Sequence, residues 1–246
     1  MAIRVASYNI RFGGGRRIRL IGDVIRAIDV DVVLLQEATN PSAVDRIATI
    51  AGMPHVLRRP GWSVACLARG RIQSHAWRRP LRGRGFLEVE PSGSDLRLIG
   101  LHLPAGLSGR GERARLYHVD ALLRELGEGA DGRTVLMGDF NSIAPGDEPL
   151  VARMPFWLRM LLRFDGGIRT DVLRRLETAG WVDAYRRLHP DKPGFTLPPG
   201  APSVRLDYLL APETLIPKVT SCDPADGIAL VERASDHLPL VSTVDV

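Results

Sequence analysis

Residues 134–147 read TVLMGDFNSIAPGD, an apolar run that passes directly into an aspartate and an asparagine. Its first four residues, Thr134 to Met137, have the length and apolar character of a buried strand. Asp139 and Asn141 are two positions apart, so on an extended chain both side chains leave the same face. A carboxylate that can take a proton thus stands beside an amide that can donate and accept. The stretch predicts a buried strand that delivers reactive groups to one edge of a sheet.

Polar residues also close or follow the other apolar segments of the chain. Extended segments are predicted at 3–10, 31–37, 62–68, 85–89, 96–103, 206–210 and 240–244. The polar residues in or beside them are Asn9, Glu37, His102, Asp207, Asp236 and His237. One such residue alone is usually a cap or a solvated loop residue, but a series is harder to explain in that way. Because α/β proteins place their sites at the ends of core strands, we expect these residues to converge on one rim.

The order of helices and strands favours a sandwich of sheets. Helical spacing predicts helices at 18–28, from Ser42 and Asp45 to Gly52, at 113–126 and at 170–179. Strands and helices mix without a strict alternation, which favours two mixed sheets packed face to face with helices outside over a doubly wound Rossmann sheet. The sequence contains no repeat, low-complexity tract or convincing linker, so we expect one domain that spans residues 1–246.

Composition is that of an ordinary globular protein. Of the 246 residues 45% are hydrophobic and 25% charged, and the net charge of +5 suits an anionic substrate. Two cysteines, Cys66 and Cys222, form neither a disulfide framework nor a zinc cluster, and we expect both to be buried thiols. No secretory leader is visible and no run approaches the ~20 apolar residues of a membrane span, so we expect a cytoplasmic protein.

Six short motifs in order resemble the endonuclease/exonuclease/phosphatase superfamily of metal-dependent phosphoesterases. They are YNIR (8–11), LLQE (34–37), GLHL (100–103), GDFN (138–141), RLDY (205–208) and SDH (235–237). The resemblance implies a four-layered α/β sandwich and the hydrolysis of a phosphate ester. It also implies a divalent metal, usually Mg²⁺, for which Mn²⁺ is a possible substitute.

The resemblance also implies roles for individual residues. Magnesium takes oxygen ligands and is commonly held by one or two carboxylates plus waters, so Glu37 is the expected direct ligand. Asn9 is its expected amide-oxygen partner, with Asp236 nearby. Asp139 is expected to orient the attacking water and accept its proton, and Asn141 to hold a phosphate oxygen through its NH₂ group.

Two histidines are expected to contact the same phosphate. His237 would do so while Asp207 hydrogen-bonds its ring, which fixes the tautomer and favours the charged form. His102 would donate a further hydrogen bond as charge builds in the transition state.

Branch-specific motifs leave the substrate open. With a histidine at position 102, the chain resembles the deoxyribonuclease, sphingomyelinase and tyrosyl-DNA phosphodiesterase branches, whereas abasic-site endonucleases typically have an aromatic residue there. Those endonucleases also have a lysine shortly after the glutamate, where this chain reads ATN, and inositol polyphosphate 5-phosphatases have W-C-D-R where it reads RLDY. We predict phosphodiester hydrolysis, with a nucleic acid ranked first and a phospholipid or small phosphoester second. A non-catalytic phosphate-binding protein ranks third, and no obligate protein partner is expected.

Candidate substrate contacts lie outside these motifs. The glycines of FGGGRR (12–17) would let the backbone approach a phosphate, with Arg16 or Arg17 behind them, although a flexible connecting loop is the alternative. Arg205 is a further candidate cation.

The segment MPFWLRMLLRF (154–164) predicts an amphipathic helix, with Arg153, Arg159 and Arg163 on one side. Such a helix either packs a wide apolar face on a sheet or contacts a membrane surface. Its Trp157 could equally stack on bases.

Overall fold

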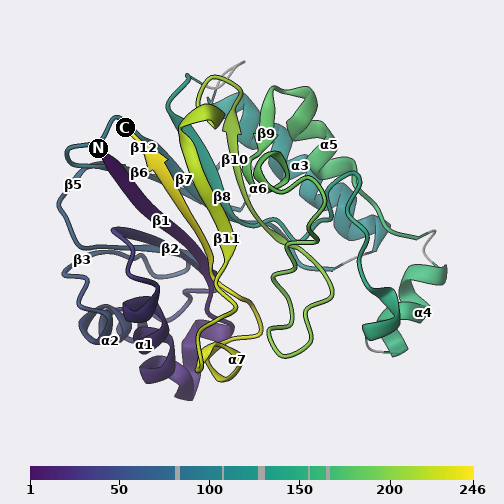
Figure 1. Cartoon of the computed structure of the whole chain (residues 1–246), viewed down its shortest axis with the longest axis horizontal. Coiled ribbons are helices and arrows are strands. Elements are labelled where there is room, and N and C mark those ends of the chain that lie inside the picture. Colours follow the sequence, from purple (N-terminus) through teal and green to yellow (C-terminus); the bar gives the residue numbers. More distant parts are fainter. Residues whose placement is uncertain (81–83, 107, 127–130, 155, 165–166) are drawn as a thin grey trace.

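Twelve strands form two six-stranded mixed sheets in the described part of the computed structural model of the chain (Figure 1). The first sheet consists, in spatial order, of β11 (Val219–Pro224), β12 (Leu240–Asp245), β1 (Ala2–Asn9), β2 (Val32–Gln36), β4 (Val64–Ala68) and β3 (His55–Leu57). The second consists of β5 (Ile72–Arg78), β6 (Phe86–Pro91), β7 (Arg97–His102), β8 (Thr134–Asp139), β10 (Asp207–Pro212) and β9 (Trp181–Asp183). The predicted pair of mixed sheets is confirmed.

Helices lie outside both sheets. They are η1 (Phe12–Arg17), α1 (Ile18–Ile28), α2 (Pro41–Ala51), α3 (Gly109–Leu126), η2 (Val151–Arg153), α4 (Phe156–Phe164), α5 (Asp171–Thr178), α6 (Ala184–Leu188), η3 (Ile216–Lys218) and α7 (Val231–Ala234). The structure describes residues 1–80, 84–106, 108–126, 131–154, 156–164 and 167–246, without the side chains of residues 157, 158, 161 and 162. Within these ranges, no helix is both long enough and apolar enough to cross a membrane.

Apolar side chains fill three layers of core. The layer between the sheets takes Val135 and Met137 from β8, while Leu136 of the same strand faces α3 and α5. Because successive side chains of a strand point to opposite faces, a strand covered on both sides must be apolar throughout, as TVLM is. A third layer joins α1 and α2 to the first sheet. Burial of each Leu or Val contributes about 1.5–3 kcal/mol, so these layers hold the strand ends in fixed register.

Strand register brings the polar residues to one edge. β7 and β8 are parallel and pair His102 with Asp139, while the antiparallel β10 pairs Asp207 with the same Asp139. In the other sheet, the parallel strands β1 and β2 pair Asn9 with Gln36. Carboxyl ends of parallel strands meet at one edge, and an antiparallel neighbour begins there. The convergence on one rim that we expected is therefore observed.

Several element boundaries differ from the prediction. α2 begins at Pro41 and is capped by the side chain of Asn40, not by Ser42 and Asp45. α3 begins at Gly109 instead of residue 113. The strand β5 was not predicted because IQSHAWR is largely polar, and it forms an exposed edge of its sheet.

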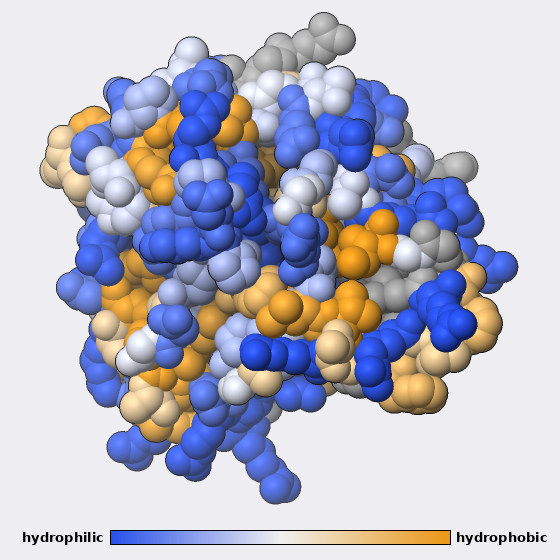
Figure 2. Space-filling model, turned by 45° about the vertical axis from the view of Figure 1, so that its right-hand side comes forward, coloured by the Kyte–Doolittle hydropathy of each residue, from blue (hydrophilic) through white to orange (hydrophobic). Residues whose placement is uncertain are grey.

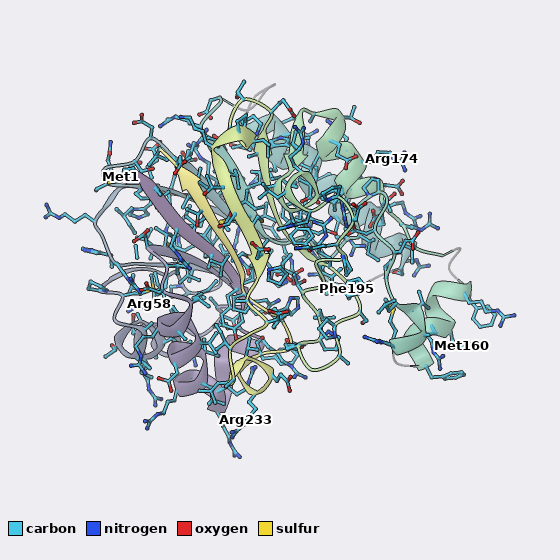
Figure 3. The ribbon with its side chains drawn as sticks, viewed as in Figure 1. Met1, Arg58, Met160, Arg174, Phe195 and Arg233 are labelled. Atoms are coloured by element: carbon cyan, nitrogen blue, oxygen red, sulfur yellow. The ribbon has the colours of Figure 1, made fainter. Side chains whose placement is uncertain are left out.

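Helix α4 stands beside the body of the molecule, away from both sheets (Figures 1 and 3). Its Phe156 is 69% exposed and its Phe164 is 80% exposed. Figure 2 shows further hydrophobic side chains on the surface of this side of the molecule. Packing on a sheet, one of the two alternatives for residues 154–164, is therefore not observed for the described part of this segment.

Candidate active site

Asp139 is the centre of the rim, and only 1% of it is exposed. Its Oδ2 accepts a hydrogen bond of 2.9 Å from Asn9 Nδ2, which reaches across from the other sheet. The Nε2 atoms of His102 and His237 lie 3.8 and 3.9 Å from the same oxygen. Its Oδ1 accepts from the backbone N–H of Asn141 at 2.9 Å. The hydrogen bonds described for this carboxylate thus come from an amide and a backbone N–H, and two histidine rings face it.

Glu37 lies beside this cluster and is linked to it by Asn9. Its Oε1 accepts from Asn9 Nδ2 at 3.2 Å, and its Oε2 accepts from the backbone N–H of Phe12 at 2.7 Å. The residue has a left-handed φ of 55°, which costs a non-glycine residue about 1 kcal/mol or more. The backbone carbonyl of Glu37 accepts from Gly13 N at 2.8 Å, so the turn is held from both ends of the residue.

The amide of Asn9 is oriented by its neighbour Arg11. The backbone N–H of Arg11 donates to Asn9 Oδ1 at 2.9 Å, and a backbone N–H can only donate. The oxygen therefore belongs on that side, and the NH₂ group faces Glu37 and Asp139. The predicted role of Asn9 as an amide-oxygen partner in the metal site stays a prediction, while its side chain presents nitrogen to the two carboxylates.

His237 and Asp207 form a buried pair. His237 Nδ1 and Asp207 Oδ2 are 2.8 Å apart, which leaves Nε2 facing Asp139. Burial alone would lower the pKa of His237, but the charge and hydrogen bond of Asp207, together with Asp139, raise this pKa to about 10. The ring is therefore charged at neutral pH.

His102 lies next to a cation. The guanidinium of Arg84 is 3.4 Å from His102 Nδ1. Burial lowers the pKa of His102 to about 4, and Arg84 acts in the same direction against the opposing charge of Asp139. A neutral ring whose Nδ1 accepts from Arg84 carries its proton on Nε2, which is the atom that faces Asp139.

Burial also raises the pKa of Asp139, with a further contribution from the neighbouring charge of Asp207. His237, His102 and the Asn9 amide oppose this shift. A carboxylate whose proton affinity is raised in this way is better suited to accept a proton from water than an exposed aspartate is.

Asp236 and Asn141 complete the rim. Asp236 Oδ2 lies 3.2 Å from Arg11 Nε, so its carboxylate is paired with an arginine. Asn141 has a left-handed φ of 50°, and its Nδ2 donates to Leu103 O at 3.1 Å. One of its two amide hydrogens is thus used within the protein, and the other remains for the predicted phosphate contact.

The sequence as a whole matches a family model. The model is that of the Endonuclease/Exonuclease/phosphatase family, and the match covers residues 6–237. The chain belongs to this family. The resemblance based on the six motifs is thereby confirmed. No curated protein sequence matches the chain.

Solved structures share the family fold with this chain at low sequence identity. A 3′ phosphatase from Neisseria, bound to a product DNA hairpin, has a TM-score of 0.75 and 20% identity. An AP endonuclease from Archaeoglobus fulgidus has a TM-score of 0.74 and 22% identity. A 3′-5′ exonuclease from Neisseria meningitidis has a TM-score of 0.73 and 18% identity. Each covers 99% of this chain and 100% of its own, and the likeness establishes the fold of the family alone.

Two of the predicted substrate-binding arginines have structural roles. Arg205 is buried and pairs with Asp147 at 2.9 Å and with Asp183 at 2.6 Å, so its charge is already matched inside the protein. Arg17 donates to the carbonyls of Ala234 at 2.8 Å and Ile10 at 3.2 Å, and so fixes the loop after β1. These contacts correct both predictions.

The other two predicted substrate contacts, Arg16 and Trp157, stay predictions. Arg16 is exposed in η1. The side chain of Trp157 lies outside the described residues. A membrane contact through residues 154–164 stays a prediction, with Phe156, Phe164 and Arg159 on the exposed surface of α4.

A cleft beside Glu37 and His102 contains residues that sequence reasoning missed. Its volume is about 600 Å³. It is lined by Phe12, Glu37, Thr39, Gly61, Trp62, Ser63, Arg79, Arg84, Gly85, His102 and Ala105. Arg79 and Arg84 come from a stretch rich in arginine and glycine that shows neither strand nor helix periodicity. No sequence signal marked them.

A buried ion pair braces two loops of the rim. Arg115 and Glu112 of α3 lie 2.7 Å apart. Arg115 Nη1 donates to Pro104 O at 3.0 Å, in the loop that follows His102. Glu112 accepts from Ser142 Oγ at 3.2 Å, in the loop that follows Asn141. The pair therefore couples the two loops that carry site residues.

The donor set fits a magnesium ion that keeps most of its waters. Among the residues the structure describes, no three His, Cys, Asp or Glu side chains gather to hold a metal on their own. Magnesium commonly takes one or two protein carboxylates and completes its shell with waters and substrate phosphate. Glu37 supplies one carboxylate at the cleft, and each oxygen retains a lone pair beyond its single hydrogen bond.

Proposed function

We propose that this protein hydrolyses a phosphodiester bond with the help of Mg²⁺ and that its substrate is a nucleic acid. The observation that carries the proposal is the surrounding of Asp139 Oδ2 by Asn9 and two histidines, in a chain of the Endonuclease/Exonuclease/phosphatase family. Mg²⁺ held by Glu37 would supply Lewis-acid polarisation of a phosphoryl oxygen.

Asp139 would act as the base. Its hydrogen bonds from Asn9 and from the Asn141 N–H fix the carboxylate in place, and burial raises its pKa. A water between Asp139 and the phosphorus would lose its proton to the carboxylate as the new P–O bond forms and the bond to the leaving oxygen breaks.

The two histidines would stabilise the phosphate in different ways. His237 is held charged by Asp207 and would donate to a non-bridging oxygen as negative charge develops there. His102 is neutral and would donate from Nε2. Because these donors are already in place before substrate arrives, little reorganisation is needed in the transition state.

Two observations support a nucleic acid over a phospholipid. The chain carries a net charge of +5, which favours a polyanion. The similar solved proteins are a phosphatase bound to a DNA hairpin, an AP endonuclease and an exonuclease.

The test is turnover of four substrates with Mg²⁺ or with chelator: plasmid DNA, an RNA oligonucleotide, bis(p-nitrophenyl) phosphate and sphingomyelin vesicles. We expect chelator-sensitive cleavage of DNA or RNA, and a loss of about 10²–10⁴-fold in kcat for Asp139→Asn. Circular dichroism establishes that the variant is folded. Asp223→Asn, at a carboxylate that is 56% exposed in its side chain, serves as the control.

Equal rates for Asp139→Asn and the parent would remove Asp139 from the role of base. Turnover of sphingomyelin alone would replace the nucleic acid by a lipid. No turnover of any substrate with metal would leave a non-catalytic phosphate-binding protein.

A further inference from the structure

The cleft beside Glu37 and His102 carries positive charge to which the site chemistry above assigns no anion. Of the residues that line it, Arg79 and Arg84 are cations and Glu37 is the one carboxylate. The cleft continues from the reaction centre toward Trp62, so a ligand anchored at Glu37 would extend along it.

Both arginines lack an acidic partner among the described residues. Arg79 lies over the ring of Trp62, with its guanidinium carbon 4.8 Å from the ring centre, and its Nη2 is 3.4 Å from the carbonyl of Gly61. Arg84 contacts His102 Nδ1 at 3.4 Å. Each guanidinium has five N–H donors, so most of them remain available to a ligand.

Three other arginines of this region are already matched. Arg11 pairs with Asp236, Arg17 donates to backbone carbonyls, and Arg205 pairs with two aspartates. The contrast matters because an arginine without a partner at the edge of a cleft loses little when an anion binds, whereas a paired one must first give up its carboxylate.

We propose that Arg79 and Arg84 form a second anion subsite, which binds a phosphate group next to the one that is cleaved. This proposal rests on the proposed phosphodiesterase function and names the substrate class more closely. A substrate with phosphates in series, as in a nucleic acid strand, has the second anion that the subsite requires. A phosphocholine lipid has a cation in that position, which two unpaired arginines repel.

The packing of the cleft wall supports a defined position for Arg79. The ring of Trp62 is fixed by Trp77, whose ring centre is 4.9 Å away, and by Gly85, where a Cβ atom would lie 1.9 Å from the Trp62 ring. Arg79 therefore lies against a rigid aromatic surface. A guanidinium held in this way loses less entropy when it binds phosphate than a fully solvated one does.

The kinetic test compares a substrate with one phosphate to a substrate with two. Wild-type protein is assayed with Mg²⁺ on the dinucleotide d(TpT) and on its 5′-phosphorylated and 3′-phosphorylated forms. We expect one of the added phosphates to lower KM about tenfold. In the double variant Arg79→Gln/Arg84→Gln, we expect the ratio of the KM of d(TpT) to the KM of its phosphorylated form to fall to near one.

Two further variants sharpen the result. Arg84→Lys keeps the charge and is expected to retain part of the ratio, because an ammonium binds phosphate without the paired hydrogen bonds of a guanidinium. Arg174→Gln removes an arginine of α5, on the outside of the second sheet (Figure 3), whose side chain contacts Thr170. It is expected to leave both the KM ratio and the turnover unchanged.

A binding measurement separates the subsite from catalysis. Calorimetric titration in chelator compares thymidine 3′,5′-bisphosphate with thymidine 5′-monophosphate. We expect the wild type to bind the bisphosphate more tightly than the monophosphate. The double variant is expected to bind the two nucleotides equally tightly.

The two proposals fail in different ways. Turnover of d(TpT) with no gain from either added phosphate, in wild type and variant alike, would overturn the subsite and leave the phosphodiesterase in place. No turnover of any dinucleotide would overturn the phosphodiesterase function. Preference of the wild type for sphingomyelin vesicles over all dinucleotides would overturn the assignment of substrate class.

Discussion

Because Asp207 holds His237 in its charged form, the free energy of unfolding of the protein is expected to fall as the pH rises from neutral to alkaline. Among the described residues, His237 is the one side-chain partner of the Asp207 carboxylate: their Nδ1 and Oδ2 atoms are 2.8 Å apart in a buried setting, and Asp207 Oδ1 is buried without a partner. We consider Asp207→Asn in the absence of metal, with chelator present throughout. The variant keeps a side chain of the same size but removes the charge that holds His237 protonated.

The magnitude follows from the pKa of His237, which is about 10 in the folded protein against 6.5 for an ordinary histidine. At about 1.36 kcal/mol for each tenfold difference in proton affinity, the raised pKa is worth about 5 kcal/mol at low pH. Since the folded pKa is the higher one, this stability is fully present below pH 6.5 and is lost as pH rises through 10. About 4 kcal/mol remains at pH 7, and less than 1 kcal/mol remains at pH 10.

The assay is urea unfolding, followed by circular dichroism, at several values between pH 7 and pH 10. We expect the wild type to lose about 3 kcal/mol more free energy of unfolding over this range than Asp207→Asn does. The difference between the two proteins matters because the tyrosines of the unfolded chain also titrate near pH 10. Asp223→Asn is the control, since Asp223 lies 2.9 Å from His189 Nε2 at an exposed position. Its stability is expected to run parallel to that of the wild type.

Parallel curves for wild type and Asp207→Asn would refute the reasoning, because they would mean that Asp207 does not hold His237 in its charged form. A wild type that gains stability between pH 7 and pH 10 would refute the sign of the effect.

Three further perturbations test other parts of the structure. Arg205→Met is expected to lower the free energy of unfolding by about 3–5 kcal/mol, measured by urea unfolding, because Asp183 loses its cation and Asp147 keeps only Arg186; an unchanged urea midpoint would contradict the structural role. Gly85→Ala places a Cβ atom 1.9 Å from the Trp62 ring, so we expect a loss of about 1–3 kcal/mol and altered tryptophan fluorescence, whereas a wild-type spectrum and midpoint would show that the ring is not confined. Glu37→Gln is expected to raise the Mg²⁺ concentration for half-maximal turnover at least about tenfold in a metal titration, and an unchanged value would exclude Glu37 as the ligand.

The rim could be predicted from sequence because it depends on strand ends alone. An apolar run such as TVLM must be covered on both faces, and the polar residue that follows it must lie at an edge of the sheet. Asp139 and His102 are neighbours because their strands are parallel and in register, and Asp207 joins them because its strand runs the other way. A continuous apolar run followed by a polar residue contains most of this information.

The edge elements could not be predicted in the same way. β5 has the composition of a loop, and its strand structure depends on hydrogen bonds to β6 that no local pattern reveals. The helix of residues 156–164 has the composition of one packed on a sheet, yet it stands apart from both sheets. In both cases, the decisive contacts are made or missing between segments that are distant in the sequence.

Roles of arginines were the least predictable feature, because an arginine binds whatever lies within its reach. Arg205 is part of a motif with site residues, and Asp147 and Asp183 nevertheless use its charge in the interior. Arg84 lies in a stretch without any pattern, and its guanidinium lies against the ring of His102. Arg205 and Arg84 differ in burial and in the groups that they contact. Neither property is encoded in the sequence next to the arginine.

The same reasoning explains why two histidines around one oxygen carry different charges. His102 and His237 place their Nε2 atoms 3.8 and 3.9 Å from Asp139 Oδ2, so their distances to the carboxylate are nearly equal. What differs is the group at Nδ1, an arginine for His102 and an aspartate for His237. Since two charged rings beside one carboxylate would repel each other, this division lets one histidine supply charge and the other a neutral donor. Exchange of the Nδ1 partner, and not of the histidine, is therefore the change that would alter the charge of the site.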